Sequence, residues 1–273
     1  MNKLKPELQE QVIGALVEGN SIRSIERMTG IHRDSIMRLG LRVGEACQTA
    51  SDAILRDLNC GHIQVDEIWC YVGKKQRHVH VTDDESTVGD FWTWVAIDSD
   101  TKLVPSYVVG KRTAETANAF VTDLASRLAN RVQLSSDGLR LYLEAIEAGF
   151  GGAVDYATIV KAYEAEPVGP GRYSPPKVIS QEKTQIVGLP YMDMASTSYV
   201  ERQNLTMRMQ MRRFTRLTNA FSKKPENLRA AVGLHFAYYN FVRVHQTIKT
   251  TPAIAAGVIK TRWTIRDLIG IAS

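Results

Sequence analysis

Three acidic residues stand where their carboxylates could hold metal ions. Asp66 lies in a strand-like segment, Val65-Asp-Glu-Ile-Trp-Cys-Tyr-Val72, and Asp137 follows the short apolar run 131–136. Glu201 lies one turn into the helix-like segment Ser198-Tyr-Val-Glu-Arg-Gln-Asn204. Carboxylates at strand ends and on a packed helix can converge on two Mg²⁺ ions, which suits phosphodiester chemistry. The three residues therefore predict a metal-dependent catalytic site.

Each acid has a defined place in this expectation. Asp66 would bridge both ions, Asp137 would hold one and Glu201 the other. The cofactor is expected to be Mg²⁺, for which Mn²⁺ can substitute. One ion lowers the pKa of the attacking water or 3′-hydroxyl and the other stabilises the leaving oxygen, so no side chain is needed as a general base.

Each acid also has a structural interpretation. Glu67 competes with Asp66, because side chains alternate between the faces of a strand and the pattern leaves open which acid faces the site. Asp137 could serve a turn, and Ser198-Tyr-Val-Glu201 fits a capping box in which the glutamate binds backbone. Weaker candidates for the third acid are Glu144, Glu147, Glu182 and Asp193.

A strongly basic segment follows Glu201. Residues 202–229 carry eight positive side chains and one acid, whereas all 273 residues have a net charge of +5. Such a concentration favours a phosphate-bearing partner, although a solvated helix face can have the same composition. The candidate contacts with double-stranded DNA in this half of the chain are Arg202, Asn204, Arg208, Arg212, Arg243 and His245.

Residues 6–45 have the apolar spacing of three helices, the second beginning after Ser21 and the third near His32. Two short helices joined by a glycine turn predict a helix-turn-helix, whose second helix would enter the major groove. Its candidate DNA contacts are Arg33, Ser35, Arg38 and Arg42. A plain three-helix packing unit is the alternative, because residues 1–60 balance eight acids against eight bases.

The central part of the chain changes to strand patterns. Strands are predicted at 63–72, 91–98, 103–109 and 131–136, with helices at 113–129 and 139–149. A right-handed crossover through the first helix should place the last strand parallel to the first and beside it, which brings Asp66 and Asp137 together. This order predicts an α/β fold with an RNase H-like mixed sheet flanked by helices, preceded by a small all-α helix-turn-helix domain.

The remaining segments complete the predicted organisation. Residues 150–195 are rich in proline and glycine and are interpreted as an irregular insertion containing a strand at 177–187. Helices are predicted at 198–217 and 226–243. The predicted units are a helix-turn-helix domain (1–48), a linker (49–60), a catalytic domain (61–257) and a C-terminal tail (258–273).

The cysteine pattern and the apolar runs bear on the compartment. Cys47, Cys60 and Cys70 are odd in number and lack Cys-x-x-Cys spacing, which favours a reducing compartment. The longest apolar runs are too short to span a bilayer, and no signal segment opens the chain. We therefore expect a cytoplasmic protein that does not bind membranes.

Residues 63–257 resemble the Asp-Asp-Glu transposases of bacterial insertion sequences, which are relatives of retroviral integrases. The matching segments are Val65-Asp-Glu-Ile-Trp69, Ser135-Ser-Asp-Gly138, Thr197-Ser-Tyr-Val-Glu-Arg-Gln-Asn204, Tyr239-Asn-Phe-Val-Arg-Val-His245 and Thr250-Thr-Pro-Ala253. The resemblance implies that Asp66, Asp137 and Glu201 are a catalytic triad. It also implies that the N-terminal helices bind terminal inverted repeats, that freed 3′-hydroxyl ends are joined to target DNA, and that the protein acts as a homo-oligomer. The 63 residues between Asp137 and Glu201 are about twice the spacing of many such enzymes, and the 150–195 segment could account for the excess.

Overall fold

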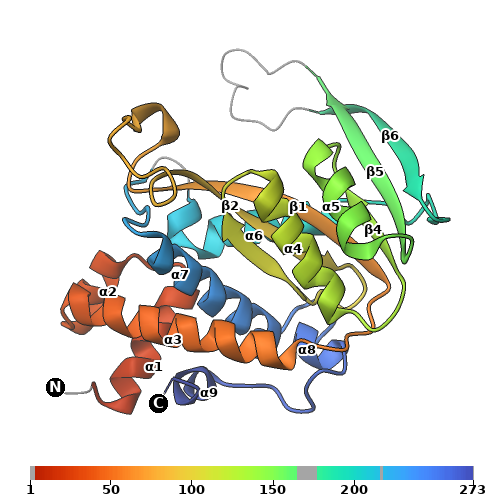
Figure 1. Ribbon diagram of the computed structural model, residues 1–273. Coiled ribbons are helices and arrows are strands. Elements are labelled where there is room, and N and C mark those ends of the chain that lie inside the picture. Colours follow the sequence, from red (N-terminus) through yellow and green to blue (C-terminus); the bar gives the residue numbers. More distant parts are fainter. Residues whose placement is uncertain (1–3, 165–176, 216–217, 273) are drawn as a thin grey trace.

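The computed structural model describes residues 4–164, 177–215 and 218–272, and its centre is one mixed sheet (Figure 1). The spatial order of the strands is β3-β2-β1-β4-β5-β6. The pairs β1–β4 and β4–β5 are parallel and the other three pairs are antiparallel. The strands are β1 (His62–Val72), β2 (Gly89–Asp98), β3 (Tyr107–Gly110), β4 (Val132–Ser136), β5 (Val154–Tyr163) and β6 (Val178–Val187).

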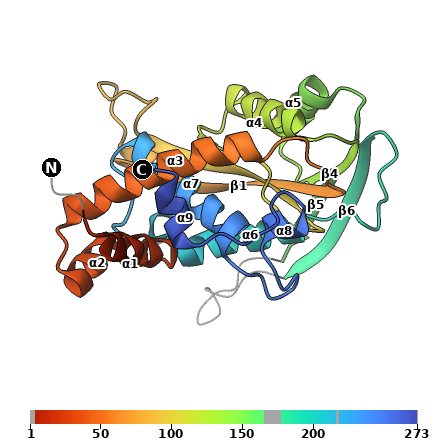
Figure 2. The ribbon, with the colours of Figure 1, turned by 90° about the horizontal axis from the view of Figure 1, so that it is seen from below.

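Helices cover both faces of this sheet, as Figure 2 shows. On one face lie α4 (Ala114–Arg127) and α5 (Arg140–Phe150), which bury Phe120 and Tyr142 against Trp94. On the other face lie α6 (Ser198–Gln210) and α7 (Pro225–Ala237). They pack on side chains of β1 and β2 that point to this face, such as Ile68 and Val95. The predicted mixed α/β sheet flanked by helices is therefore confirmed.

The N-terminal helices pack on the body of the protein. They are α1 (Pro6–Val17), α2 (Ile22–Thr29) and α3 (Arg33–Ile54). The Ser21 side chain caps α2, and Gly30 ends it in the left-handed region at φ 68°. The long α3 runs through the first residues of the predicted linker and lies against α7 (Figure 1). A DNA-binding unit at residues 1–48 stays a prediction.

The α3–α7 contact depends on two glycines. A Cβ atom on Gly44 of α3 would lie 2.1 Å from the carbonyl oxygen of Ala230, and one on Gly233 of α7 would lie 2.8 Å from the Gly44 oxygen. The two helix backbones therefore approach more closely than any side chain would allow.

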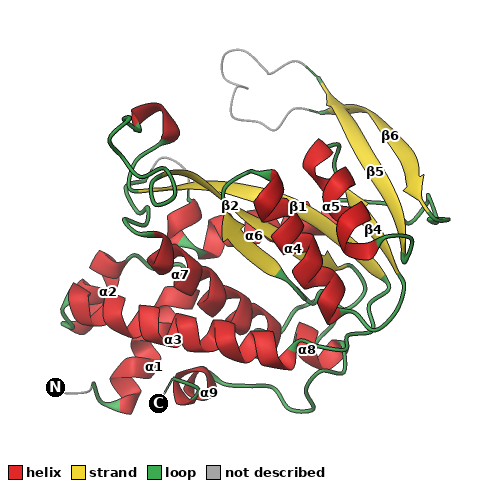
Figure 3. Ribbon diagram, in the orientation of Figure 1, coloured by secondary structure: helices red, strands yellow, loops and turns green. Residues whose placement is uncertain are grey.

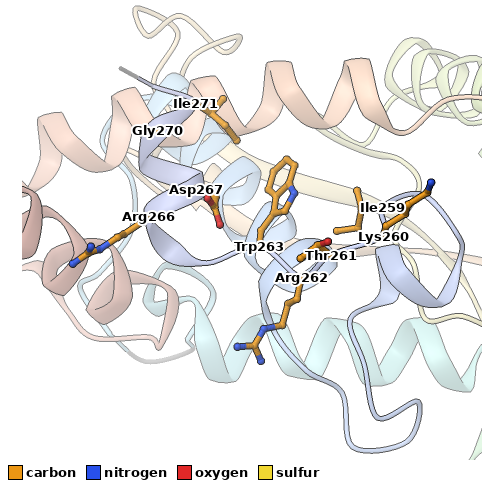
Figure 4. A pocket seen from close by; sticks show the side chains of 9 residues that line it. All are labelled: Ile259, Lys260, Thr261, Arg262, Trp263, Arg266, Asp267, Gly270 and Ile271. Carbon is orange, nitrogen blue, oxygen red and sulfur yellow. The ribbon is translucent and has the colours of Figure 1, made fainter.

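The C-terminal segment folds back over these helices. After α7 come a π-helical turn, η4 (Tyr238–Val242), then α8 (Pro252–Ala255) and α9 (Ile265–Gly270). Trp263 stacks on Phe241 at 4.5 Å, and Arg266 pairs with Glu10 of α1 at 2.7 Å. Nine residues of this segment, Ile259 to Arg262, Trp263, Arg266, Asp267, Gly270 and Ile271, line an open hollow of about 870 Å³ (Figure 4). The three predicted catalytic acids do not line it.

The structure corrects two predicted segments. Residues 154–163, predicted as part of an irregular insertion, form β5, whose first half is buried beside β4 and whose second half forms a ribbon with β6 (Figure 3). The predicted strand at 177–187 is confirmed as β6. The helix predicted at 198–217 ends at Gln210, because the chain turns there to bury Met211 and, in the short 3-10 helix η3 (Arg212–Phe214), Phe214.

One smaller difference has a local cause. The strand predicted at 103–109 begins only at Tyr107, since Pro105 has no N–H to donate to the ladder. Parts of the predicted insertion (165–176) and basic helix (216–217) lie outside the described residues. No helix in the described part of the chain combines the length and the apolar character needed to cross a bilayer.

Candidate metal centre

Side-chain alternation along β1 decides between Asp66 and Glu67. Ile63 and Val65 pack in the cluster that includes α4 and α5, whereas Ile68 and Cys70 pack in the cluster that includes α6 and α7. Because successive strand residues point to opposite faces, Asp66 faces α6 and Glu67 faces the other side. Asp66 is therefore the acid on the face that carries Glu201, and its role as a metal ligand stays a prediction.

Asp137 lies beside Asp66 through strand register. β1 and β4 are parallel, and Gln64 pairs with Ser135. Asp66 and Asp137 each follow that pair by two residues, so the end of β4 lies beside the middle of β1. Carboxylate oxygens of Asp66, Glu67 and Asp137 lie within 4.8 Å of one another. This cluster offers the hard oxygen ligands that divalent cations such as Mg²⁺ prefer. Asp137 also makes the turn contact considered from the sequence, since its Oδ1 accepts a hydrogen bond from the backbone N–H of Leu139 at 2.9 Å.

Glu67 is satisfied by protein groups. Its Oε1 accepts a hydrogen bond from Arg112 at 2.6 Å and its Oε2 accepts one from the Tyr142 hydroxyl at 3.1 Å. Only 3% of its side chain is exposed. An ion pair and a hydrogen bond already engage both oxygens. Glu67 therefore fits a structural role on the α4–α5 face of the sheet better than the role of a metal ligand.

Glu201 lies outside the 4.8 Å group but on the same face of the sheet. Its Oε1 accepts a hydrogen bond from the Thr197 hydroxyl at 2.6 Å and pairs with the Lys161 ammonium. The helix cap is Thr197, and the Glu201 carboxylate bonds its hydroxyl, not the backbone N–H that a capping box requires. The capping-box interpretation is therefore not observed.

Gln64 ties the helix of Glu201 to the strand of Asp66. Its Oε1 accepts hydrogen bonds from the backbone N–H groups of Tyr199 at 2.8 Å and Val200 at 3.2 Å. These are free N–H groups of the first turn of α6, which need such partners. One turn further along, Asn204 Nδ2 donates to Asp66 Oδ2 at 2.8 Å. The two contacts fix Glu201 relative to Asp66.

The carboxylates influence one another electrostatically. Burial and, after it, the negative charges of Glu67, Asp137 and Glu201 together raise the pKa of Asp66 to about 7, against a backbone hydrogen bond that lowers it. Burial and the charge of Asp137 also raise the pKa of Glu67. A divalent cation beside Asp66 and Asp137 would lower the repulsion between these carboxylates, so the arrangement favours a bound cation.

This pKa shift makes a prediction for the metal-free protein. Folded Asp66 keeps a proton between its ordinary pKa of 3.8 and about 7, whereas the unfolded chain has released it. The folded state binds more protons in that window, so the contribution of Asp66 lowers the free energy of unfolding as pH rises through it. We expect Asp66→Asn to gain stability relative to wild type from pH 4 to pH 7 and to hold that gain above pH 7. Urea unfolding in EDTA at several pH values measures the difference; a difference independent of pH would contradict the shift.

The predicted DNA contacts fall into two groups. Arg33, Arg38, Arg42 and Arg202 are exposed, and Ser35 is half-buried on α3. Arg212 is exposed on η3, beyond the end of the helix in which it was predicted. The other four are at least partly buried. Asn204 donates a hydrogen bond to Asp66, and Arg208 is half-buried. Arg243 and His245 have buried nitrogen atoms, Nη1 of Arg243 and Nε2 of His245. The His245 ring packs edge-on against Tyr239 at 4.4 Å.

Gln64, Arg112, Tyr142 and Lys161 were not foreseen as part of the site. Gln64 could have been found, because it precedes Asp66 by two residues and must share its face. Arg112, Tyr142 and Lys161 lie in three separate segments, and no local sequence pattern predicts that they contact these acids. The weaker candidates for the third acid, Glu144, Glu147, Glu182 and Asp193, are all exposed.

No protein-family model matches this chain, and no curated protein matches it. The functional assignment therefore depends on the residues and contacts described above.

Proposed function

We propose that the chain is a metal-dependent DNA transposase of the Asp-Asp-Glu type. One observation carries the proposal: Asp66 and Asp137 occupy equivalent register positions on neighbouring parallel strands, and Gln64 and Asn204 hold the helix of Glu201 against them. The three acids come from segments separated by 71 and 64 positions in sequence, and the carboxylate oxygens of Asp66 and Asp137 lie within 4.8 Å of each other.

The topology supports the proposal. Three antiparallel strands, a helix, and a strand that returns parallel to β1 give the order β3-β2-β1-β4-β5. This is the order expected of an RNase H-like fold, to which β6 adds one strand. The helix-turn-helix character of residues 1–48 belongs to the same proposal, as does recognition of terminal inverted repeats.

Asp66, Asp137 and Glu201 would hold Mg²⁺, or Mn²⁺ in its place. When bound, such ions activate a water or 3′-hydroxyl for attack on a phosphodiester and stabilise the leaving oxygen. The protein supplies the charge that attracts the ions, the fixed spacing of the carboxylates, and Asn204, which orients Asp66. The basic segment after Glu201 would guide the DNA backbone to this face.

The proposal also covers the binding partners and the cellular compartment. Joining two element ends to a target needs both ends in one assembly, so we propose a homo-oligomer on double-stranded DNA in the bacterial cytoplasm. An RNase H-like nuclease without strand transfer and a non-catalytic DNA-binding regulator are the alternatives that the experiment below separates.

The test is cleavage and strand transfer in Mg²⁺ on DNA that carries the flanking inverted repeats. Joined products support a transposase, cleaved but unjoined DNA indicates a nuclease, and binding without cleavage in Mg²⁺ or Mn²⁺ indicates a regulator.

Glu201→Gln tests the third acid within the same assay. Glutamine can still accept the Thr197 hydrogen bond but carries no charge for a metal, so we expect cleavage to fall about 100-fold or more with DNA affinity retained. Glu144→Gln, an exposed acid on α5, is the matched control and should cleave normally. Full cleavage by Glu201→Gln would remove Glu201 from the metal site.

A further inference from the structure

Lys161 is a cation held on the candidate metal face. It lies in the outer half of β5, and its side chain is only 16% exposed. Its ammonium pairs with Glu201, whose side chain is 45% exposed. A lysine on an exposed ribbon would ordinarily extend into water, so the burial of this one reflects a specific partner.

Strand alternation shows that Lys161 faces the same side as the acids. Ala157 and Ile159 pack with Ala195, in the segment that leads into α6, whereas Tyr156 packs in the α4–α5 cluster. Lys161 follows Ile159 by two residues and therefore points toward α6. β5 adjoins β4, which carries Asp137 at its end. Lys161 thus approaches the acids from the strand next to theirs.

We propose that Lys161 is an exchangeable counter-ion: it neutralises Glu201 in the metal-free protein, yields Glu201 to a divalent cation, and then binds a DNA phosphate beside the site. This rests on the proposed function. The Lys161 ammonium and the Thr197 hydroxyl both contact Oε1 of Glu201. A divalent cation bound by this carboxylate would be repelled by the ammonium charge beside it, so binding of the cation favours release of Lys161. Released from Glu201, the ammonium remains on the face where the phosphodiester must lie, and lysine binds phosphate well.

Two measurements test the exchange. Mn²⁺ affinity without DNA is followed by electron paramagnetic resonance of free Mn²⁺, and DNA affinity in Ca²⁺ is followed against salt concentration. In Lys161→Met we expect Mn²⁺ to bind about fivefold more tightly, as fits the loss of a partly exposed ion pair. We expect the slope of log affinity for DNA against log salt to be smaller by about one, as fits one lost phosphate contact.

The controls separate charge from structure. Lys161→Gln should behave like Lys161→Met, and Lys161→Arg should keep both wild-type values. Lys183→Met removes the same charge from the neighbouring strand β6, where Lys183 donates to the Met192 carbonyl at 2.7 Å, and should leave Mn²⁺ affinity unchanged. Circular dichroism melting confirms that each variant is folded.

The outcomes distinguish this inference from the proposed function. If wild type, Lys161→Met and Lys161→Gln all bind Mn²⁺ with the same affinity, the counter-ion role is overturned and the proposed function is not. An unchanged salt slope would overturn the phosphate contact. No Mn²⁺ binding by wild type would overturn the proposed function, and the inference with it.

Discussion

Asp66→Asn is expected to slow Mg²⁺-dependent DNA cleavage by about 1000-fold or more, because loss of a metal ligand at the reacting centre removes several kcal/mol of transition-state stabilisation. Asparagine keeps the size of the side chain and its place beside Asn204, so the fold and the affinity for DNA should persist. Single-turnover cleavage in Mg²⁺, with DNA affinity measured in Ca²⁺, checks both parts.

Glu67→Gln is the matched control, because Glu67 is the next residue and faces the other side of the sheet. Glutamine can still accept the hydrogen bond from Arg112 through its Oε1, and its Nε2 can donate to the Tyr142 hydroxyl oxygen, so cleavage should remain within about tenfold of wild type. If Glu67→Gln lost activity as completely as Asp66→Asn, the acids that hold the metal would be Asp66, Glu67 and Asp137 instead.

Gly44→Ala is expected to destabilise the protein by about 3 kcal/mol, the upper part of the usual range for overpacking. The new methyl group would lie 2.1 Å from the Ala230 carbonyl oxygen and 2.6 Å from its carbon, so two helix backbones must separate. Urea unfolding monitored by circular dichroism measures the loss.

Gly40→Ala is its control, four residues earlier on the same helix. Its Cβ would meet only the end of the Leu16 side chain, at 3.1 Å, which can move. Alanine favours a helix over glycine by up to about 1 kcal/mol, so this variant should be neutral or slightly more stable. Equal stability of Gly44→Ala and Gly40→Ala would show that α3 does not pack on α7 in solution.

The elements with strong local patterns were predicted well from the sequence. β1, β2, β4 and α4 have regular apolar spacing, and their bounds differ from the predicted ones by a few residues. Parallel pairing of β1 with β4 followed from the handedness of crossovers, and it was enough to bring Asp66 beside Asp137.

What the sequence could not predict depends on contacts between distant segments. β5 begins with a short apolar run among glycines and prolines, and it becomes a strand because β4 offers it a parallel partner. The end of α6 at Gln210 is set by burial of Phe214, which overrides the helical propensity of the residues before it. Lys161 and Glu201 lie 40 positions apart, so no local spacing predicts their pairing.

Alternation on β1 was visible in the sequence, but its direction was not. Ile63 and Val65 share a face with Glu67, which made Glu67 a competitor for the site. Both faces of this strand are buried, so the apolar pattern cannot identify the functional face. Only the position of α6, fixed by Gln64, shows that the Asp66 face is the one with the third acid.

The most direct test of the central claim is anomalous diffraction from crystals of the protein soaked in Mn²⁺. We predict a peak in contact with carboxylate oxygens of Asp66 and Asp137, and metal ligation by Glu201 once its contact with Lys161 is released. A peak held by Glu67 with Arg112 displaced, or the absence of any peak near Asp66 at saturating Mn²⁺, would contradict the assignment of Asp66, Asp137 and Glu201 as the metal-binding triad.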